Sequence, residues 1–243
     1  MGPFFSGNWA MIIEESRLAA AKQSGGISSS AIYNAVIAAA VDANPAPATI
    51  LDFGTGSGQL LPVLADHFPG AKLHAADIME RPADLPEYVT WHRGDLNHEA
   101  PIAAASFEMV FAVEVIEHLE NPRHMIREIA RLLTPGGVAI MSTPNTGSIR
   151  SIVTFAARGH HAQFDDSNYP AHITPMGEVD FARIGNEAGL KCERFFYTAT
   201  GMVPKLLSLR WQDLPLVGKS LRGRRFSDNF GVLFRKPIDA RLI

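Results

Sequence analysis

The most informative stretch of the sequence is ILDFGTGSGQL at residues 50–60, where an apolar run meets an acid and three alternating glycines. Gly54, Gly56 and Gly58 carry no Cβ atom, so the backbone of such a turn can approach a bound molecule closely. Strand-to-helix turns of this kind bind phosphates in some proteins. The turn is therefore the first candidate for a ligand site.

Three features of this turn argue against a pyrophosphate ligand. A dinucleotide fingerprint, G-x-G-x-x-G, needs a glycine at the position that Gln59 occupies. A P-loop would end in Lys followed by Ser or Thr, and this turn does not. Asp52, just before the turn, would repel a phosphate and attract a cationic ligand, such as one that carries an ammonium or a sulfonium group.

Two further acids stand where apolar segments end. Asp77 closes the segment LHAAD, and a carboxylate at the end of the second strand can accept both hydroxyls of a ribose. Asp95, in the motif GDLN, follows the third strand, where it can accept from an adenine amino group. Together with Asp52, these acids favour a cationic ligand that carries a ribose and an adenine. S-adenosylmethionine fits that description.

The order of apolar segments predicts an α/β domain. Strand patterns alternate with helix patterns, and this βαβα rhythm favours a mostly parallel sheet with helices on both faces. We expect strands at 49–53, 72–76, 88–93, 107–113, 138–142, 190–197 and 230–234. We expect helices at 8–22, with Asn8 as its cap, from a cap at 28–30 to about 43, and at 59–68, 122–133 and 176–188.

Five motifs in this order resemble those of a class I S-adenosylmethionine-dependent methyltransferase: ILDFGTGSGQ, HAADI, GDLNHEAP, FEMVFAVEVIEHLENP and LLTPGGVAIMSTPN. They cover about residues 48–145. The resemblance implies a Rossmann-like methyltransferase fold with a mostly parallel seven-stranded sheet, S-adenosylmethionine as cofactor and S-adenosylhomocysteine as product. It divides the chain into an N-terminal helical extension, 1–47, and a methyltransferase domain, 48–243, with a cap region at 144–175 and a basic segment at 202–229.

The resemblance also implies roles for particular residues. Gly54, Gly56 and Gly58 would line the methionine and ribose portion of the cofactor, and Asp52 would lie near its ammonium group. The other residues implied to bind the cofactor are Asp77 at the ribose hydroxyls, Ile78 packed on the adenine, Asp95 and Leu96 at the adenine edge and face, and Glu114 at the methionine end.

Candidate catalytic groups lie in EVIEHL, which holds Glu117 and His118, and in YPAHITP, which holds His172. A hydroxyl acceptor needs a base to take its proton, and histidine suits that role near neutral pH. We therefore expect His118 to be a catalytic base or a polar group of the active site. The resemblance places His172 over the methyl group of the cofactor. Alternatively, Glu117 and His118 orient the loop before the helix at 122–133.

The same motifs resemble two groups of enzymes, the ubiquinone-biosynthesis type O-methyltransferases and the metal-dependent 2′-O-methyltransferases of small-RNA 3′ ends. The second resemblance implies that Glu114, Glu117, His118 and His172 bind a divalent metal. However, this chain has NYPAHITPMGEVDF where that group has a charged RHxDHxFEW-like stretch. Residues 1–204 are also acidic overall, whereas RNA binding requires positive charge. We therefore favour no metal, no nucleic acid, and a small-molecule or glycan hydroxyl as acceptor.

Two other classes of function stay open as alternatives. A non-catalytic protein could use the same acids and glycines to bind S-adenosylmethionine without turnover. An NAD-dependent oxidoreductase is disfavoured by Gln59. The chain has 243 residues and one cysteine, Cys192, which cannot form an internal disulfide. With no predicted signal peptide, we expect a cytoplasmic protein.

Two long segments of the chain lie outside the regular pattern. Residues 143–174 carry few regular signals, and a long irregular stretch inside a domain is usually functional. One expectation is that its polar residues, His160, His161, Asp165, Asp166 and Tyr169, line the acceptor pocket beneath a lid. The alternative, above all for His160 and His161, is a polar surface loop. The basic segment mixes apolar residues with arginines, which suits weak contact with a membrane surface. The alternatives are a packed insertion or a homodimer contact.

Overall fold

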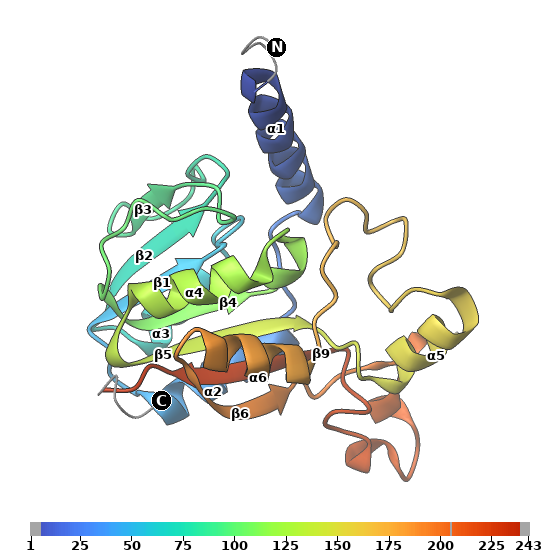
Figure 1. The fold of residues 1–243 in the computed structure, drawn as a ribbon. Coiled ribbons are helices and arrows are strands. Elements are labelled where there is room, and N and C mark those ends of the chain that lie inside the picture. The colour runs from blue at the N-terminus through green and yellow to red at the C-terminus, as the bar shows by residue number, and fades with distance from the viewer. Residues whose placement is uncertain (1–5, 205, 239–243) are drawn as a thin grey trace.

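A seven-stranded sheet forms the centre of the molecule in the computed structural model, which describes residues 6–204 and 206–238 (Figure 1). The strand order is β3-β2-β1-β4-β5-β9-β6. All neighbouring pairs are parallel except those that β9 makes with β5 and β6. The strands are β1 (Thr49–Phe53), β2 (Lys72–Asp77), β3 (Thr90–Arg93), β4 (Phe107–Val113), β5 (Leu133–Pro144), β6 (Lys191–Tyr197) and β9 (Asn229–Arg235). The predicted mostly parallel sheet is confirmed.

The topology determines where a ligand can bind. Strands β1 and β4 are neighbours, but β2 and β3 continue the sheet on one side while β5 continues it on the other. The connections therefore diverge at the carboxyl ends of β1 and β4 and leave a crevice between them. Open α/β sheets bind their ligands at such a switch point. The glycine turn follows β1 directly, so it lies at this crevice.

Two apolar layers hold the helices on the two faces of the sheet. Successive strand residues point to opposite faces, so Ile50 packs in one layer and Leu51 in the other. The layer of Ile50 is covered by α2 (Ser30–Ala43) and α3 (Leu60–His67). The layer of Leu51 is covered by α4 (Pro122–Leu132) and α6 (Glu178–Glu187). Figure 1 shows α4 and α6 together on one face of the sheet.

The predicted helix boundaries agree with the structure to within one or two residues for α3, α4 and α6. The side chain of Asn121 caps α4 by accepting from the backbone N–H of His124 at 2.9 Å, and Pro122 occupies the first turn. Helix α1 begins at Ser6, so the prediction that Asn8 caps this helix is wrong. Helix α1 (Ser6–Ser24) extends away from the body of the molecule (Figure 1).

The predicted irregular stretch contains a helix that the sequence analysis missed, α5 (Ile149–Arg158). The hydroxyl of Ser148 caps it by accepting from the backbone N–H of Ser151 at 3.1 Å. Gly159 ends it in the left-handed region, at φ +83°. The signals for this helix are present in the sequence, because Ser148 and Gly159 occupy cap positions and the apolar residues between them recur at helical spacing. The prediction of few regular signals in this stretch is therefore wrong.

The basic segment packs beside α5 and forms small elements of its own. These are β7 (Met202–Val203), β8 (Leu206–Arg210) and the 3₁₀ turns η2 (Trp211–Asp213) and η3 (Gly218–Ser220), while η1 (Ile116–His118) follows β4. The backbone N–H of Ile149 donates to the carbonyl of Arg225 at 2.9 Å. Among the described residues, no helix has both the length and the apolar character needed to cross a bilayer.

Candidate functional site

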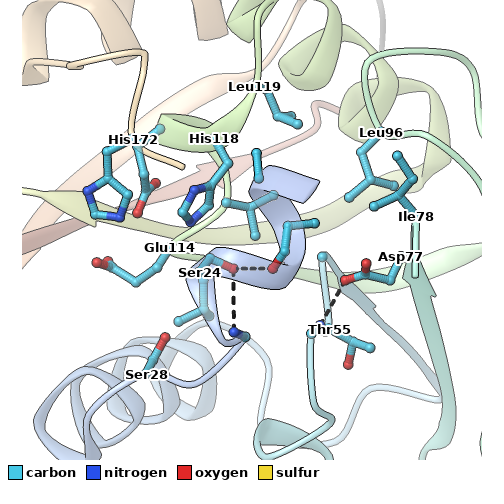
Figure 2. A pocket seen from close by; sticks show the side chains of 18 of the residues that line it. Ser24, Ser28, Thr55, Asp77, Ile78, Leu96, Glu114, His118, Leu119 and His172 are labelled. Atoms are coloured by element: carbon cyan, nitrogen blue, oxygen red, sulfur yellow. Dashed lines mark hydrogen bonds between the residues drawn. The ribbon is translucent and has the colours of Figure 1, made fainter. Parts of the chain in front are cut away.

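The turn between β1 and α3 takes a backbone shape that requires glycine. Gly54, Gly56 and Gly58 have φ values of +87°, +54° and +81°, a region that residues with a Cβ atom rarely adopt. The N–H of Gly56 donates to a carboxylate oxygen of Asp77 at 2.8 Å, which ties the turn to the end of β2 (Figure 2). The turn is therefore a fixed cradle with its backbone bare toward the crevice.

The link between α1 and α2 packs directly on this turn. A Cβ atom built on Gly26 would lie 2.7 Å from the Cα atom of Gly56, so neither residue has room for a side chain. The carbonyl of Gly26 also accepts from the backbone N–H of Ser57 at 3.2 Å and from its hydroxyl at 2.8 Å. The N-terminal extension thus completes the wall of the site.

A cavity of about 510 Å³ opens between the turn, the N-terminal extension and the cap region. Its size falls in the range of about 300 to 1,000 Å³ that small-molecule sites occupy. Figure 2 shows the side chains that line it converging from the ends of the strands, from the N-terminal extension and from the cap region. The predicted site residues that line it are Asp52, Gly54, Gly56, Asp77, Ile78, Asp95, Leu96, Glu114, His118 and His172.

Burial changes the proton affinity of the two acids nearest the turn. Loss of solvation raises the pKa of Asp52 to about 7, against the opposing effect of a hydrogen bond from the hydroxyl of Thr55. Burial also raises the pKa of Asp77, which backbone N–H groups of Met79 and Gly56 partly offset. Each carboxyl group therefore gains from a cationic or hydrogen-donating partner in the cavity.

Asp95 already has partners at the far end of the cavity. One of its oxygens accepts from Arg17 of α1 at 2.6 Å, and the other accepts from the side chain of Asn97 at 3.0 Å. Arg17 also forms an ion pair with Glu120 at 2.5 Å, so it bridges α1 to two loops of the sheet. Both carboxylate oxygens of Asp95 therefore already accept a hydrogen bond, one from Arg17 and one from Asn97. A further donor in the cavity would have to share one of these oxygens.

Glu114 stands at the end of β4 in a strained backbone, with φ at +55°. Strain of this kind in a residue other than glycine persists where surrounding contacts hold it, often at functional sites. Its carboxylate accepts from Ser142 at 2.8 Å and from Asn229 at 2.6 Å. Burial and the neighbouring Glu117 raise its pKa well above the usual value, so Glu114 favours its neutral form.

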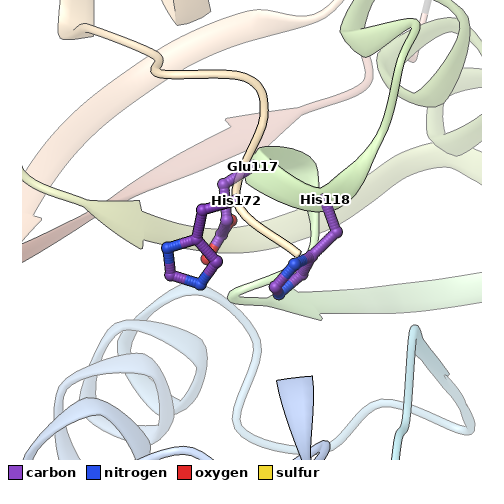
Figure 3. Close-up of side chains that lie close together, drawn as sticks. All are labelled: Glu117, His118 and His172. Atoms are coloured by element: carbon purple, nitrogen blue, oxygen red, sulfur yellow. The ribbon is translucent and has the colours of Figure 1, made fainter. Parts of the chain in front are cut away.

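His118 and His172 lie next to each other in an edge-to-face contact, with their ring centroids 4.9 Å apart (Figure 3). The Nδ1 atom of His118 lies 2.8 Å from the carbonyl of Ala171, and that of His172 lies 2.6 Å from the carbonyl of Gln163. Because a carbonyl can only accept, each Nδ1 carries the proton and each Nε2 is left with a lone pair. Burial lowers the pKa of both rings, so both favour the neutral form at neutral pH.

Glu117 lies beside the two histidines and is fully buried. One of its oxygens accepts from Thr143 at 3.1 Å, whereas Oε1 has no hydrogen-bond partner among the described residues. Burial raises its pKa to about 8. Ligand atoms of Glu117, His118 and His172 lie within 4.8 Å of one another, so this cluster can either move a proton or hold a divalent cation.

Gly58 and most of the polar cap residues lie outside the lining of this cavity. A Cβ atom on Gly58 would meet the side chain of Leu85 at 3.0 Å, so this glycine serves the packing of the turn. In the cap region, His161 contacts the hydroxyl of Ser151 at 3.0 Å, and Asp165 accepts from Ser167 and Asn168 within its own loop. Tyr169 does line the cavity.

Several lining residues were missed at the level of sequence. Arg17, Tyr33 and Asn229 reach the cavity from α1, α2 and the start of β9. The sequence carries a signal only for the extension, where Gly25 and Gly26 separate the two predicted helices. Asn229 meets Glu114 because β9 pairs with β5, a contact between residues 115 positions apart that no motif announces.

Most of the chain matches the model of one protein family. A family model described as a methyltransferase domain matches residues 30–194, which include the glycine turn, the strand-end acids and both histidines. The match extends well beyond the five motifs noticed in the sequence.

Curated relatives match in part. The trans-aconitate 2-methyltransferase of Pseudomonas paraeruginosa is 32% identical over 103 residues, which make up 41% of this chain and 37% of that protein. The ubiquinone biosynthesis O-methyltransferase of Coxiella burnetii is 26% identical over 141 residues, or 55% of this chain and 56% of that protein. This chain thus covers little more than a third of the former and about half of the latter.

Solved structures share the fold at low sequence identity. The 1,6-didemethyltoxoflavin-N1-methyltransferase of Burkholderia thailandensis, crystallised with its substrate and S-adenosylhomocysteine, superposes with a TM-score of 0.61. It is 14% identical, and the alignment covers 98% of this chain and 93% of that one. The N-methyltransferase NodS of Bradyrhizobium japonicum gives a TM-score of 0.52 at 18% identity, with 83% and 84% coverage.

Proposed function

We propose an acceptor and a base for this chain, which belongs to the class I S-adenosylmethionine-dependent methyltransferases. The acceptor is a hydroxyl group of a small molecule or a glycan, and His118 takes its proton. The observation that carries this proposal is the pair of neutral imidazoles whose Nδ1 protons are fixed by backbone carbonyls. Each presents an Nε2 lone pair in the cavity that also contains Asp77 and Gly56.

The residues around the glycine turn suit S-adenosylmethionine. A side chain at Gly56 would clash with the backbone of Gly26, so this glycine lets the N-terminal link close on the turn and form one wall of the cavity. In our proposal, Asp77 holds the ribose hydroxyls, Ile78, Asp95 and Leu96 hold the adenine, and Asp52 balances the ammonium group. When bound, the cofactor supplies a methyl group that is already electrophilic. The protein has to align the acceptor, exclude water and remove a proton.

The charge around the cavity favours a hydroxyl over a carboxylate acceptor. Among the described lining residues, Arg17 is the one cation, and it is paired with Asp95 and Glu120. The acceptor end instead carries two glutamates and two histidines. A carboxylate substrate would meet no positive partner there, whereas a hydroxyl can donate its proton to the Nε2 atom of His118.

The test is formation of S-adenosylhomocysteine with three acceptor classes: a phenol, a monosaccharide and a dicarboxylate. We expect turnover with a hydroxyl acceptor and not with the dicarboxylate. In His118→Asn, the amide can still donate toward Ala171 but the base is gone, so kcat should fall about 100-fold or more while S-adenosylhomocysteine binding persists. His67→Asn, an exposed histidine on α3, is the matched control and should keep full activity.

Two results would overturn this assignment. Preference for the dicarboxylate would contradict the hydroxyl acceptor. Loss of activity on chelation, restored by added Mg²⁺, Mn²⁺ or Zn²⁺, would assign Glu117, His118 and His172 to a metal centre in place of a free base.

A further inference from the structure

Helix α5 turns its polar side inward and its apolar side outward. Ser151 is buried, whereas Ile152, Val153 and Phe155 are 44%, 39% and 52% exposed. A surface helix normally presents its apolar stripe to the core. Exposed apolar patches on otherwise ordinary proteins mark contact surfaces. The outer face of α5 therefore needs a partner that the described chain does not supply.

A second exposed apolar group lies at the tip of the basic segment. Leu216 is completely exposed, and its φ of +67° puts a leucine in the left-handed region. The next residue, Val217, is 53% exposed. A solvated loop with no other role would favour Asn or Gly at such a position. An apolar side chain held outward by strained backbone points to a function at this tip.

The two apolar groups lie on elements that are joined to each other and are rich in positive charge. The start of α5 is anchored to the basic segment by the hydrogen bond from Ile149 to Arg225 and by an ion pair between Arg150 and Asp228 at 2.9 Å. Both elements project from the same end of the molecule (Figure 1). The basic segment, 202–229, contains six Lys or Arg and two Asp, one of which pairs with Arg150, and α5 ends in the exposed Arg158.

We propose that α5 and the basic segment form a docking surface for an anionic lipid bilayer. Its apolar members are Ile152, Val153, Phe155, Leu216 and Val217, and its cations include Arg158, Lys219, Arg222 and Arg225. Apolar side chains that project among cations can enter the boundary between headgroups and acyl chains while the cations contact anionic headgroups. A second copy of this chain would bring like charges together, so charge complementarity favours the bilayer.

The apolar residues exposed on α1 do not share this property. Met11, Ile12 and Ile13 are also exposed, but Glu14 and Glu15 follow them directly. Carboxylates beside an apolar patch are repelled by anionic lipid. The proposal therefore applies to one end of the molecule and provides an internal control at the other.

Flotation of the full chain with vesicles tests the proposal. We expect binding to vesicles that contain phosphatidylglycerol and none to pure phosphatidylcholine. Raising the salt from about 0.1 M to about 1 M shortens the Debye length from about 10 Å to about 3 Å, so binding should weaken strongly. This measurement needs no variant. A wild-type protein that stays in solution with both vesicle types would overturn the proposal.

Two double variants separate the apolar and the cationic contributions. Ile152→Ser with Leu216→Asn removes one apolar side chain from each element, and Asn suits the left-handed backbone. Arg222→Ala with Arg225→Ala removes two cations but spares Arg224, which pairs with Glu178 at 3.0 Å. Each double variant should weaken partitioning about tenfold or more. Thermal unfolding and S-adenosylhomocysteine binding check that the variants fold.

The matched controls lie elsewhere on the molecule. Ile12→Ser with Ile13→Ser removes exposed apolar area from α1, and Arg183→Ala with Lys191→Ala removes exposed cations from α6 and β6. Both should leave partitioning unchanged. Equal losses in these controls would mean nonspecific adsorption and contradict the proposal. So would light scattering that shows a wild-type dimer broken by the Ile152→Ser, Leu216→Asn change, because that result would make a second copy the occupant.

Discussion

Single carboxyl groups determine how this site responds to charge. Asp52 and Asp77 are both buried near the glycine turn, and burial raises the pKa of each. Asp52, whose pKa is raised to about 7, is partly protonated near neutral pH, and a cationic ligand can replace that proton. The affinity for an ammonium-bearing ligand should therefore rise as the pH rises and Asp52 loses its proton.

The pH range of this change follows from Asp52, because burial raises its pKa to about 7. Below that pH the group is mostly neutral, and binding an ammonium group must first remove the proton. We expect the affinity of wild type for S-adenosylhomocysteine to rise about tenfold between about pH 6 and about pH 8. Isothermal titration at both pH values measures it. Asp52→Asn should bind more weakly at the higher pH and lose the dependence, and a wild type with equal affinities would contradict the role of Asp52.

Asp77 has two tasks that a substitution can separate. It holds the turn through the N–H of Gly56, and in our proposal it also accepts the ribose hydroxyls. Asp77→Ala should weaken S-adenosylhomocysteine binding about 10- to 100-fold, since charge-assisted hydrogen bonds contribute about 1.5–3 kcal/mol each. A competitor that lacks ribose hydroxyls makes the control, because its affinity should fall much less. Equal losses for both ligands would show that Asp77 acts through the turn alone.

Among the secondary-structure elements, the N-terminal extension is an integral part of the wall of the cavity. Its link rests on the glycine turn at Gly26, and α1 reaches Asp95 through Arg17. In addition, the side chain of Gln23 donates to the carbonyl of Tyr169 at 2.9 Å, so α1 contacts the cap region. The family model begins at residue 30 and leaves α1 out, although α1 covers the site.

Two adjacent glycines allow a clean test of that contact. In Gly26→Ala, the new Cβ would lie 2.7 Å from backbone of Gly56, which must push the link away from the turn. We expect at least tenfold weaker S-adenosylhomocysteine binding, because a shift of the link opens the cavity wall. Gly25→Ala is the matched control, since it shares a positive φ, at +71°, but meets nothing within 4 Å.

The control should lose about 1 kcal/mol of stability from its left-handed backbone and keep its affinity. Isothermal titration and thermal unfolding on both variants separate the two effects. Equal affinities in Gly25→Ala and Gly26→Ala would mean that the link does not shape the site.

Over the molecule as a whole, the features that could be predicted from the sequence are those that depend on residues close together in the chain. The sheet, the glycine turn and the acids at strand ends follow from local periodicity and from the divergence of connections at β1 and β4. Contacts between distant segments did not follow. Arg17 and Asp95 are 78 positions apart and Asn229 and Glu114 are 115 apart, and neither pair belongs to a motif. Helix α5 was missed although Ser148, Gly159 and the apolar spacing between them mark a helix; only the outward direction of its apolar side could not be predicted.

The hydrogen bond between Gln23 and Tyr169 links two segments that line the cavity. The last turns of α1 and the stretch from Gln163 to His172 both line the cavity. A movement of α1 away from this stretch would break the hydrogen bond between Gln23 and Tyr169. A displacement of one of these segments therefore bears on the other, because both border the same cavity and share this hydrogen bond.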